Sequence, residues 1–148
     1  FVICNKADKP EAWQKLFDCL AEGNQAWCVN VPVLIAACHD TQFADNPTPF
    51  AGKPNSFAAY DTGAASVSLC LQANHLGLMT HQMGGFSADL LKEKFEIPER
   101  FTAAAVIALG YQTTEVNVPE AFKSRELSPR KRNPLGENFF SGSWGKGV

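Results

Sequence analysis

The sequence predicts an α+β domain in which a central sheet is flanked by helices and one long apolar helix lies at the centre. Short apolar runs rich in β-forming residues alternate with segments of helical periodicity. Residues 57–78 are apolar on nearly every side, which is typical of a helix in the middle of a protein. The chain has 148 residues, of which 45% are hydrophobic. This length favours a single domain with a core of its own.

The first 40 residues are expected to form two strands and two helices. Residues 1–4 read FVIC, a short run of β-forming residues. A helix is predicted to begin near Pro10, because proline suits a first turn, and apolar residues then recur at helical spacing. Gly23 is expected to end that helix. A short helix through residues 24–30 and a buried strand over 32–40 follow.

The rest of the chain is predicted to hold the central helix, a further helix, a strand and an irregular tail. Three prolines and a glycine mark 41–56 as a loop, and Gly77 is expected to end the central helix. Another helix begins at Ser87, and residues 101–111 form a buried strand. The tail, 112–148, carries aromatic residues with no core of their own. The uncovered helix and this tail predict an intertwined homodimer.

Composition and motifs argue against several classes of function. The net charge is −2, so bulk charge does not indicate nucleic-acid binding, and no run of 18 apolar residues indicates a membrane span. The five cysteines include no CxxC pair and are expected to be buried, reduced thiols of a cytoplasmic protein. No HExxH, GxSxG or GxGxxG motif occurs. We therefore expect no metal site, no activated nucleophile and no Rossmann cofactor site.

Residues 81–86 read HQMGGF and lie between the central helix and the helix that begins at Ser87. Two consecutive glycines remove the Cβ atoms that would keep a ligand away from the backbone. A planar ligand could therefore lie against this main chain, and the start of the next helix adds donors. Gly-Gly is also a common turn signal, so a plain turn remains the alternative at this point.

The one basic cluster reads PRKRNP, residues 129–134. Alternate residues of an extended chain point to the same side, so Arg130 and Arg132 could act together while Lys131 points away. Two guanidinium groups so placed could fork onto the oxygens of a phosphate. A solvated basic run is the alternative interpretation of this cluster.

Taken in order, several segments resemble the FMN-dependent nitroreductase family. AAYDTGAASVSLCLQANHLGLMTHQMGGFS resembles the family's central helix and following strand, in the branch whose members carry HQM-x-GF. NQAWCVNVPVLIAAC resembles its helix-then-strand, FEIPERFTAAAVIALGY its "IP…GY" strand, and RKRNPL its phosphate-binding segment. The similarity covers nearly the whole chain, and the ordered set of motifs is more specific than any one of them.

The resemblance implies an α+β homodimer with FMN at the interface and the aromatic tail packed on the partner subunit. Carried onto this sequence, Gln82, Met83, Gly84 and Gly85 would line the flavin, with a main-chain N–H of Gly84 or Gly85 directed at flavin N5. Arg130 and Arg132 would hold the FMN phosphate. A Gly85→Val substitution is then expected to block the flavin and leave the dimer folded.

The implied activity is an NAD(P)H-dependent flavin oxidoreductase. Hydride would pass from NAD(P)H through flavin N5 to a small-molecule acceptor, a nitroaromatic or a quinone, in a ping-pong scheme. The cofactor carries this chemistry, so no side chain is expected to be catalytic.

The sequence departs from the family at its start. Members begin with an R-x-S-x-R segment and an Asn-x-Gln-Pro stretch that also contact FMN, and neither occurs here. We therefore expect residues 1–148 to form a single nitroreductase-like domain without the family's N-terminal segment. This departure keeps two alternatives open: a truncated, non-catalytic flavin-binding or interaction module, and an interaction protein with no ligand.

Overall fold

The computed structural model describes residues 1–44, 49–114 and 118–148. It divides into two compact units, Phe1–Gln112 and Thr113–Val148, and each is described by itself. Residues 45–48 of the predicted loop and 115–117 of the predicted tail lie outside the described residues. None of the described helices is both long enough and apolar enough to cross a bilayer.

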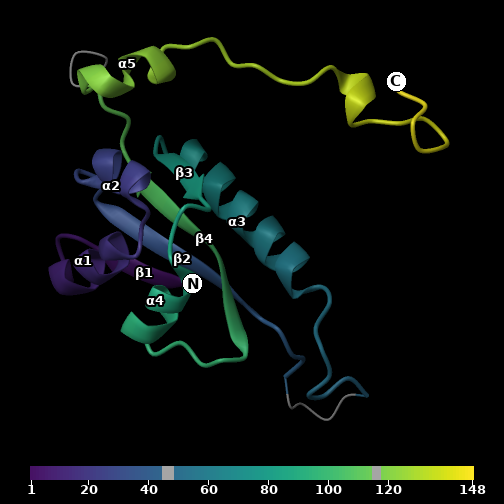
Figure 1. Ribbon diagram of the computed structural model, residues 1–148, viewed down its shortest axis with the longest axis horizontal. Helices are drawn as coiled ribbons and strands as arrows, with labels where there is room; N and C mark the ends of the chain where they lie inside the picture. The colour runs from purple at the N-terminus through teal and green to yellow at the C-terminus, as the bar shows by residue number, and fades with distance from the viewer. Residues whose placement is uncertain (45–48, 115–117) are drawn as a thin grey trace. The chain divides into compact units, whose positions relative to one another are not determined.

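The first unit is built on a four-stranded sheet in the order β1-β2-β4-β3 (Figure 1). All neighbouring strands are antiparallel, which confirms the predicted α+β class. The strands are β1 (Val2–Asn5), β2 (Val33–Asp40), β3 (Met79–Met83) and β4 (Phe101–Gly110). The apolar runs predicted as strands at 1–4, 32–40 and 101–111 therefore correspond to β1, β2 and β4. Strand β3 is an edge strand and leads directly to the two glycines.

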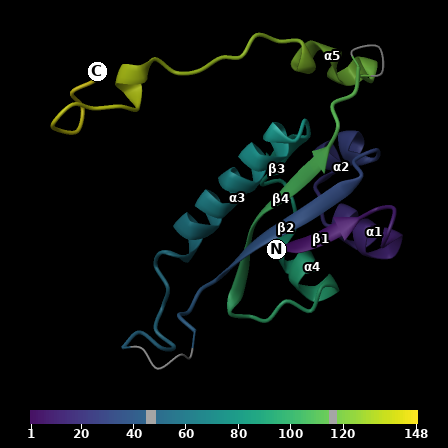
Figure 2. The same cartoon turned by 180° about the vertical axis from the view of Figure 1, so that it is seen from behind.

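Helices cover both faces of this sheet (Figures 1 and 2). Helices α1 (Pro10–Asp18), α2 (Glu22–Cys28) and α4 (Ala88–Lys94) lie on one side, and α3 (Ala58–His75) lies on the other. Side chains alternate along the strands, so Leu34 and Val106 belong to the core beneath α1, α2 and α4. Ile35 and Ile107 are buried on the opposite face, towards α3. The sheet is therefore apolar on both faces, as its continuous hydrophobic strands predict.

Helix α3 corresponds to the predicted central helix, but it covers one face of the sheet and is not buried on all sides. It ends at His75, and Gly77 lies just beyond this end, as expected. Gly77 has a φ of +78°, and the Leu78 N–H donates to the Ala73 carbonyl at 2.9 Å, which closes the helix end. The buried residues of α3 are Ala58, Ser66 and Ala73. All three are small, so the face of the helix with small side chains packs on the sheet. Its larger apolar side chains face outward in a single copy: Tyr60 is 79% exposed, Val67 51% and Leu71 67%.

The prediction that Gly23 ends the first helix is wrong. Helix α1 ends at Asp18, and Gly23 lies inside α2. The cause is a tertiary contact: the segment after α1 becomes extended and pairs with the segment after β3, through an antiparallel bridge between Leu20 and Phe86. A partner more than sixty residues away thus interrupts a run whose local pattern is helical.

The second unit holds α5 (Glu120–Glu126), which the sequence analysis did not predict, and a short 3-10 helix at Leu135–Glu137. The last residues fold back on themselves through a bridge between Phe140 and Gly147, and the Phe140 and Trp144 rings lie 4.8 Å apart. Trp144 remains 90% exposed. The second unit therefore has local order of its own, and its own residues do not cover Trp144.

An ion pair joins the two central strands at the point where the chain leaves the sheet. Nε of Arg100 donates to both carboxylate oxygens of Asp40, at 2.9 and 3.1 Å, and Nη2 adds a third contact. The Thr41 N–H and hydroxyl both donate to the Arg100 carbonyl, at 2.9 and 2.6 Å. These bonds hold the end of β2 against the start of β4.

The Asp40–Arg100 pair predicts a specific acid sensitivity. Hydrogen bonds from Arg100 hold the pKa of Asp40 below its ordinary value. The pair's contribution is therefore complete above the unfolded-state pKa of about 3.9 and is lost as the pH falls through the lower folded-state pKa. We expect Asp40→Asn to lower the melting temperature at pH 7, with a difference from wild type that shrinks below about pH 4. A difference that stays constant down to pH 2 would contradict this.

Candidate functional site

The HQMGGF stretch forms the junction between edge strand β3 and helix α4. After the glycines the chain pairs with residues 19–21: the Ala21 N–H donates to the Gly85 carbonyl at 2.9 Å, and the Ser87 N–H donates to the Cys19 carbonyl at 2.8 Å. The Ser87 hydroxyl then caps α4 by accepting from the Leu90 N–H at 3.2 Å. Some of the main-chain N–H groups that were predicted to be free at the start of α4, those of Ser87 and Leu90, therefore already donate within the chain.

The two glycines have different surroundings. A Cβ at Gly84 would meet nothing within 4 Å, whereas a Cβ at Gly85 would lie 2.8 Å from Nδ2 of Asn24. Neither glycine has a left-handed φ, so a turn that demands positive φ does not explain the pair. At Gly85 the absence of a side chain lets α2 of the same chain approach the backbone. At Gly84 the absence of a side chain leaves the backbone facing open space.

Both glycines keep main-chain donors available. Within the described ranges, the structure provides no acceptor for the N–H of Gly84 or of Gly85. Both residues are exposed. Unsatisfied main-chain donors beside open space can bind an acceptor atom on a ligand. This arrangement favours the ligand interpretation of HQMGGF over the plain turn.

The two residues before the glycines differ in what they can offer. Met83 as a whole is 2% exposed and lies in the core, with its sulfur 3.7 Å from the thiol of Cys28. This burial argues against a direct contact between Met83 and a ligand. Gln82 is exposed, and its side-chain amide nitrogen lies 3.5 Å from the Cys70 sulfur on α3. The predicted ligand contacts of Gln82, Gly84 and Gly85 stay predictions.

Helix α2 holds this stretch in place, and the sequence analysis missed it. Nδ2 of Asn24 donates to the Gly85 carbonyl at 2.9 Å. The Trp27 ring meets the His81 ring edge-on, with centroids 5.1 Å apart, and Cys28 packs against Met83. Nothing in the local sequence pairs residues about sixty positions apart, so this support could not be predicted from periodicity or motifs.

Arg130 and Arg132 lie in the second unit, and both are exposed. Residues 129–134 have no regular structure, and Nη1 of Arg132 donates to the Lys131 carbonyl at 2.7 Å. Both guanidinium groups remain at the surface, where an anion can reach them. Their joint action on one phosphate, and their place relative to the glycines, stay predictions.

Four of the five thiols are poorly suited to act as nucleophiles. Burial raises the pKa of the Cys28 thiol to about 12, and burial also raises the pKa values of Cys4, Cys19 and Cys38. These four thiols are therefore protonated near neutral pH, and a protonated thiol is a poor nucleophile and a poor metal ligand. Cys28, which lies against Met83, therefore contributes packing rather than reactivity to the junction.

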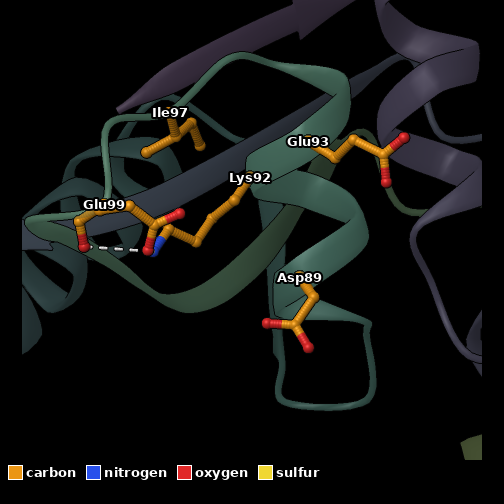
Figure 3. Close-up of a pocket in the computed structure, with 5 residues that line it drawn as sticks. All are labelled: Asp89, Lys92, Glu93, Ile97 and Glu99. Carbon is orange, nitrogen blue, oxygen red and sulfur yellow. Dashed lines mark hydrogen bonds and ion pairs between the residues drawn. The ribbon is translucent and has the colours of Figure 1, made fainter.

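A hollow beside α4 is a poor alternative site. It has a volume of about 230 Å³, and the five residues lining it are Asp89, Lys92, Glu93, Ile97 and Glu99 (Figure 3). Lys92 is already paired with Glu99 at 3.0 Å, so the remaining charges are carboxylates. An anionic ligand would be repelled there.

The fold and the junction define an α+β protein that presents free main-chain donors at one edge of an antiparallel sheet. Residues 3–111 match the model of the nitroreductase family. The chain therefore belongs to the nitroreductase family, which confirms the resemblance carried by its motifs.

Individual relatives agree with this assignment. The solved structure of an oxidoreductase containing FMN is 34% identical, with a TM-score of 0.86 over 98% of this chain and 71% of that one. A nitroreductase family protein from Clostridium difficile 630 has the same fold, with a TM-score of 0.66 and 24% identity over 96% of this chain and 72% of that one. An uncharacterised 15.4 kDa protein from the ask 5′ region of Mycolicibacterium smegmatis is 36% identical. That match spans 60% of each chain.

The different surroundings of the glycines predict different costs of substitution. Gly85→Ala must displace the Asn24 side chain and break its bond to the Gly85 carbonyl. We expect it to be about 1 kcal/mol less stable than Gly84→Ala, which is the net contribution of one such hydrogen bond. Urea denaturation of the two variants measures this difference. Equal stabilities would show that Asn24 does not restrict Gly85.

The Asn24 contact limits what Gly85→Val can test, and the expected outcome of that substitution stays a prediction. A valine at that position would displace the Asn24 side chain, so a loss of ligand binding alone would not separate a blocked site from a disturbed fold. Gly84, with open space beside it, is the position at which a larger side chain tests ligand approach.

Proposed function

We propose that this chain provides the FMN-binding domain of an NAD(P)H-dependent oxidoreductase. The observation that carries the proposal is the pair of free main-chain donors at Gly84 and Gly85, together with the open space beside Gly84 that a side chain would fill. Family membership and the 34% identical FMN-containing oxidoreductase support it. The proposal is the nitroreductase reaction in general form, with nitroaromatics or quinones as acceptors.

The residues at the junction suit a flavin. The N5 edge of an isoalloxazine ring carries a lone pair, which an N–H of Gly84 or Gly85 can satisfy. The absence of a Cβ at Gly84 allows the ring edge to come within hydrogen-bonding distance. Bound there, FMN would supply the electron transfer, taking hydride from NAD(P)H and passing it to the acceptor in a ping-pong scheme.

The protein's own part in this reaction is binding and orientation. The glycine backbone would hold the ring, and Arg130 and Arg132 would bind the phosphate. No side chain of the junction is needed as an acid or base. Flat, electron-poor acceptors suit a site whose task is to stack a ring against the flavin, which is why nitroaromatics and quinones are the proposed classes.

A homodimer is part of the proposal. The outward side chains Tyr60, Val67 and Leu71 of α3, together with Phe139 and Trp144 of the tail, are unusually large apolar groups to leave in water. A second copy of the chain would cover them. The free cysteines support a reducing, cytoplasmic location, since extracellular thiols are usually oxidised to disulfides.

A second candidate is a non-catalytic flavin-binding or interaction module. The two functions differ in turnover: both retain FMN, but only the oxidoreductase oxidises NAD(P)H when a quinone is supplied.

The first experiment is a visible absorption spectrum of the purified chain, taken before and after addition of FMN and gel filtration. We expect flavin absorbance to co-elute with a dimer. Gly84→Val should lose that absorbance, because its side chain fills the space beside the donors. Gly23→Val is the matched control, since a Cβ at Gly23 also meets nothing within 4 Å but lies in α2. Retention of FMN by Gly84→Val would place the flavin elsewhere.

The phosphate clamp makes a separate prediction. Arg132→Ala should weaken FMN binding by about tenfold or more, because charged hydrogen bonds contribute about 1.5–3 kcal/mol. Riboflavin, which lacks the phosphate, should bind wild type and variant equally. Titration of both ligands, followed by flavin fluorescence, measures the difference. An equal loss for the two ligands would remove Arg132 from the phosphate site.

A further inference from the structure

The Gly85 carbonyl accepts two hydrogen bonds from the α2 region. The Ala21 N–H and Nδ2 of Asn24 both donate to it at 2.9 Å. The other end of the same peptide continues this pattern. Its N–H, that of Phe86, donates to the Gly84 carbonyl at 3.1 Å, which closes a three-residue turn around Gly85. Asn24 thus stands at the start of a continuous series of hydrogen bonds.

The series ends at the Gly85 N–H. The Gly85 carbonyl and the Phe86 N–H belong to one peptide unit, and the Gly84 carbonyl and the Gly85 N–H belong to the next. A peptide whose oxygen accepts a hydrogen bond becomes a stronger donor at its nitrogen, and such chains polarise one another. The two donors on the Gly85 carbonyl therefore strengthen the Phe86 N–H, and that bond in turn strengthens the Gly85 N–H.

This geometry separates the two glycine donors. The Gly84 N–H belongs to the Met83–Gly84 peptide, which lies outside the series. The Gly85 N–H has no acceptor in the described part of the chain and is the terminal donor of the series. It is also held at both sides, because Asn24 packs against the Gly85 Cα and the turn closes over it. Gly85 is therefore the better oriented and more strongly polarised of the two.

We propose that Asn24 is a positioning residue that orients and polarises the Gly85 N–H as the main-chain donor to the flavin. The identity of the acceptor rests on the proposed function, but the hydrogen-bond series does not. Asn24 itself acts through the backbone and touches no reacting atom. Its role follows from the direction in which its amide points: the nitrogen donates to Gly85, and a residue without a donor there cannot replace it.

The test uses the flavin-free chain, so it does not depend on cofactor binding. The amide proton shift of Gly85 is measured by ¹H–¹⁵N NMR in wild type, Asn24→Ala, Asn24→Asp and Gln14→Ala. Gln14→Ala is the matched control. It also removes one side-chain hydrogen bond, from Nε2 of Gln14 to Oδ1 of Asp18 at 2.7 Å, but neither of these residues takes part in the series. Asn24→Asp keeps the side-chain shape but replaces the donor with an acceptor.

We expect the Gly85 and Phe86 amide protons to move upfield in Asn24→Ala and further in Asn24→Asp, and to stay in place in Gln14→Ala. Equal shifts in Asn24→Ala and Gln14→Ala would overturn the proposal, because they would reflect the loss of any side-chain hydrogen bond rather than of this series. If Asn24→Ala folds poorly, the isosteric Asp variant decides: an unchanged Gly85 amide in that variant would also overturn it.

A second readout addresses the flavin. Asn24→Ala should bind FMN about tenfold more weakly, as expected for a weakened hydrogen bond, and should lower the midpoint potential of the bound flavin. Gln14→Ala should change neither quantity. If wild type fails to retain FMN, the proposed function fails while the amide shifts still decide the role of Asn24. If FMN binds and its potential is the same in wild type and Asn24→Ala, the polarising role is wrong.

Discussion

The pairing of residues 19–21 with residues 85–87 is the constraint on which the rest of the first unit depends. Main-chain hydrogen bonds through Ala21, Gly85 and Ser87 join the α1–α2 connection to the β3–α4 junction. They end α1 early, start α2 beside the edge strand and place the Asn24 side chain against Gly85. Because the pairing is made by backbone atoms, it depends on the approach of two segments rather than on any one side chain.

That pairing also explains why the main-chain N–H groups of Gly84 and Gly85 have no acceptor in the described part of the chain. The carbonyl of Gly85 is turned inward to α2, where it is satisfied twice, so the glycine N–H groups are left on the exposed side. Buried polar groups are normally paired, and the ones that remain free are found where a ligand or water can reach them. An anchored carbonyl and a free N–H on successive peptides make a rigid donor that needs no reorganisation when a ligand binds.

The functional proposal relies on backbone and surface charge rather than on reactive side chains. The buried thiols are protonated, and the Met83 side chain is part of the core. A protein of this kind supplies orientation and electrostatics to a cofactor that carries the reaction. The two sides of α3 differ in the same way: its small side chains pack on the sheet, and its large apolar side chains stay exposed. The homodimer proposed above would cover those exposed side chains.

The sequence by itself determined the α+β class, three of the four strands and the extent of α3 with Gly77 beyond its end, and it directed attention to HQMGGF. Each of these depends on local pattern: apolar runs, helical spacing, a glycine at a helix end and two glycines at a junction. The order of the strands, the early end of α1, the different surroundings of Gly84 and Gly85 and the position of Asn24 were decided only by the tertiary structure. All of them depend on contacts between segments that are distant in the sequence, and local pattern carries no information about such contacts.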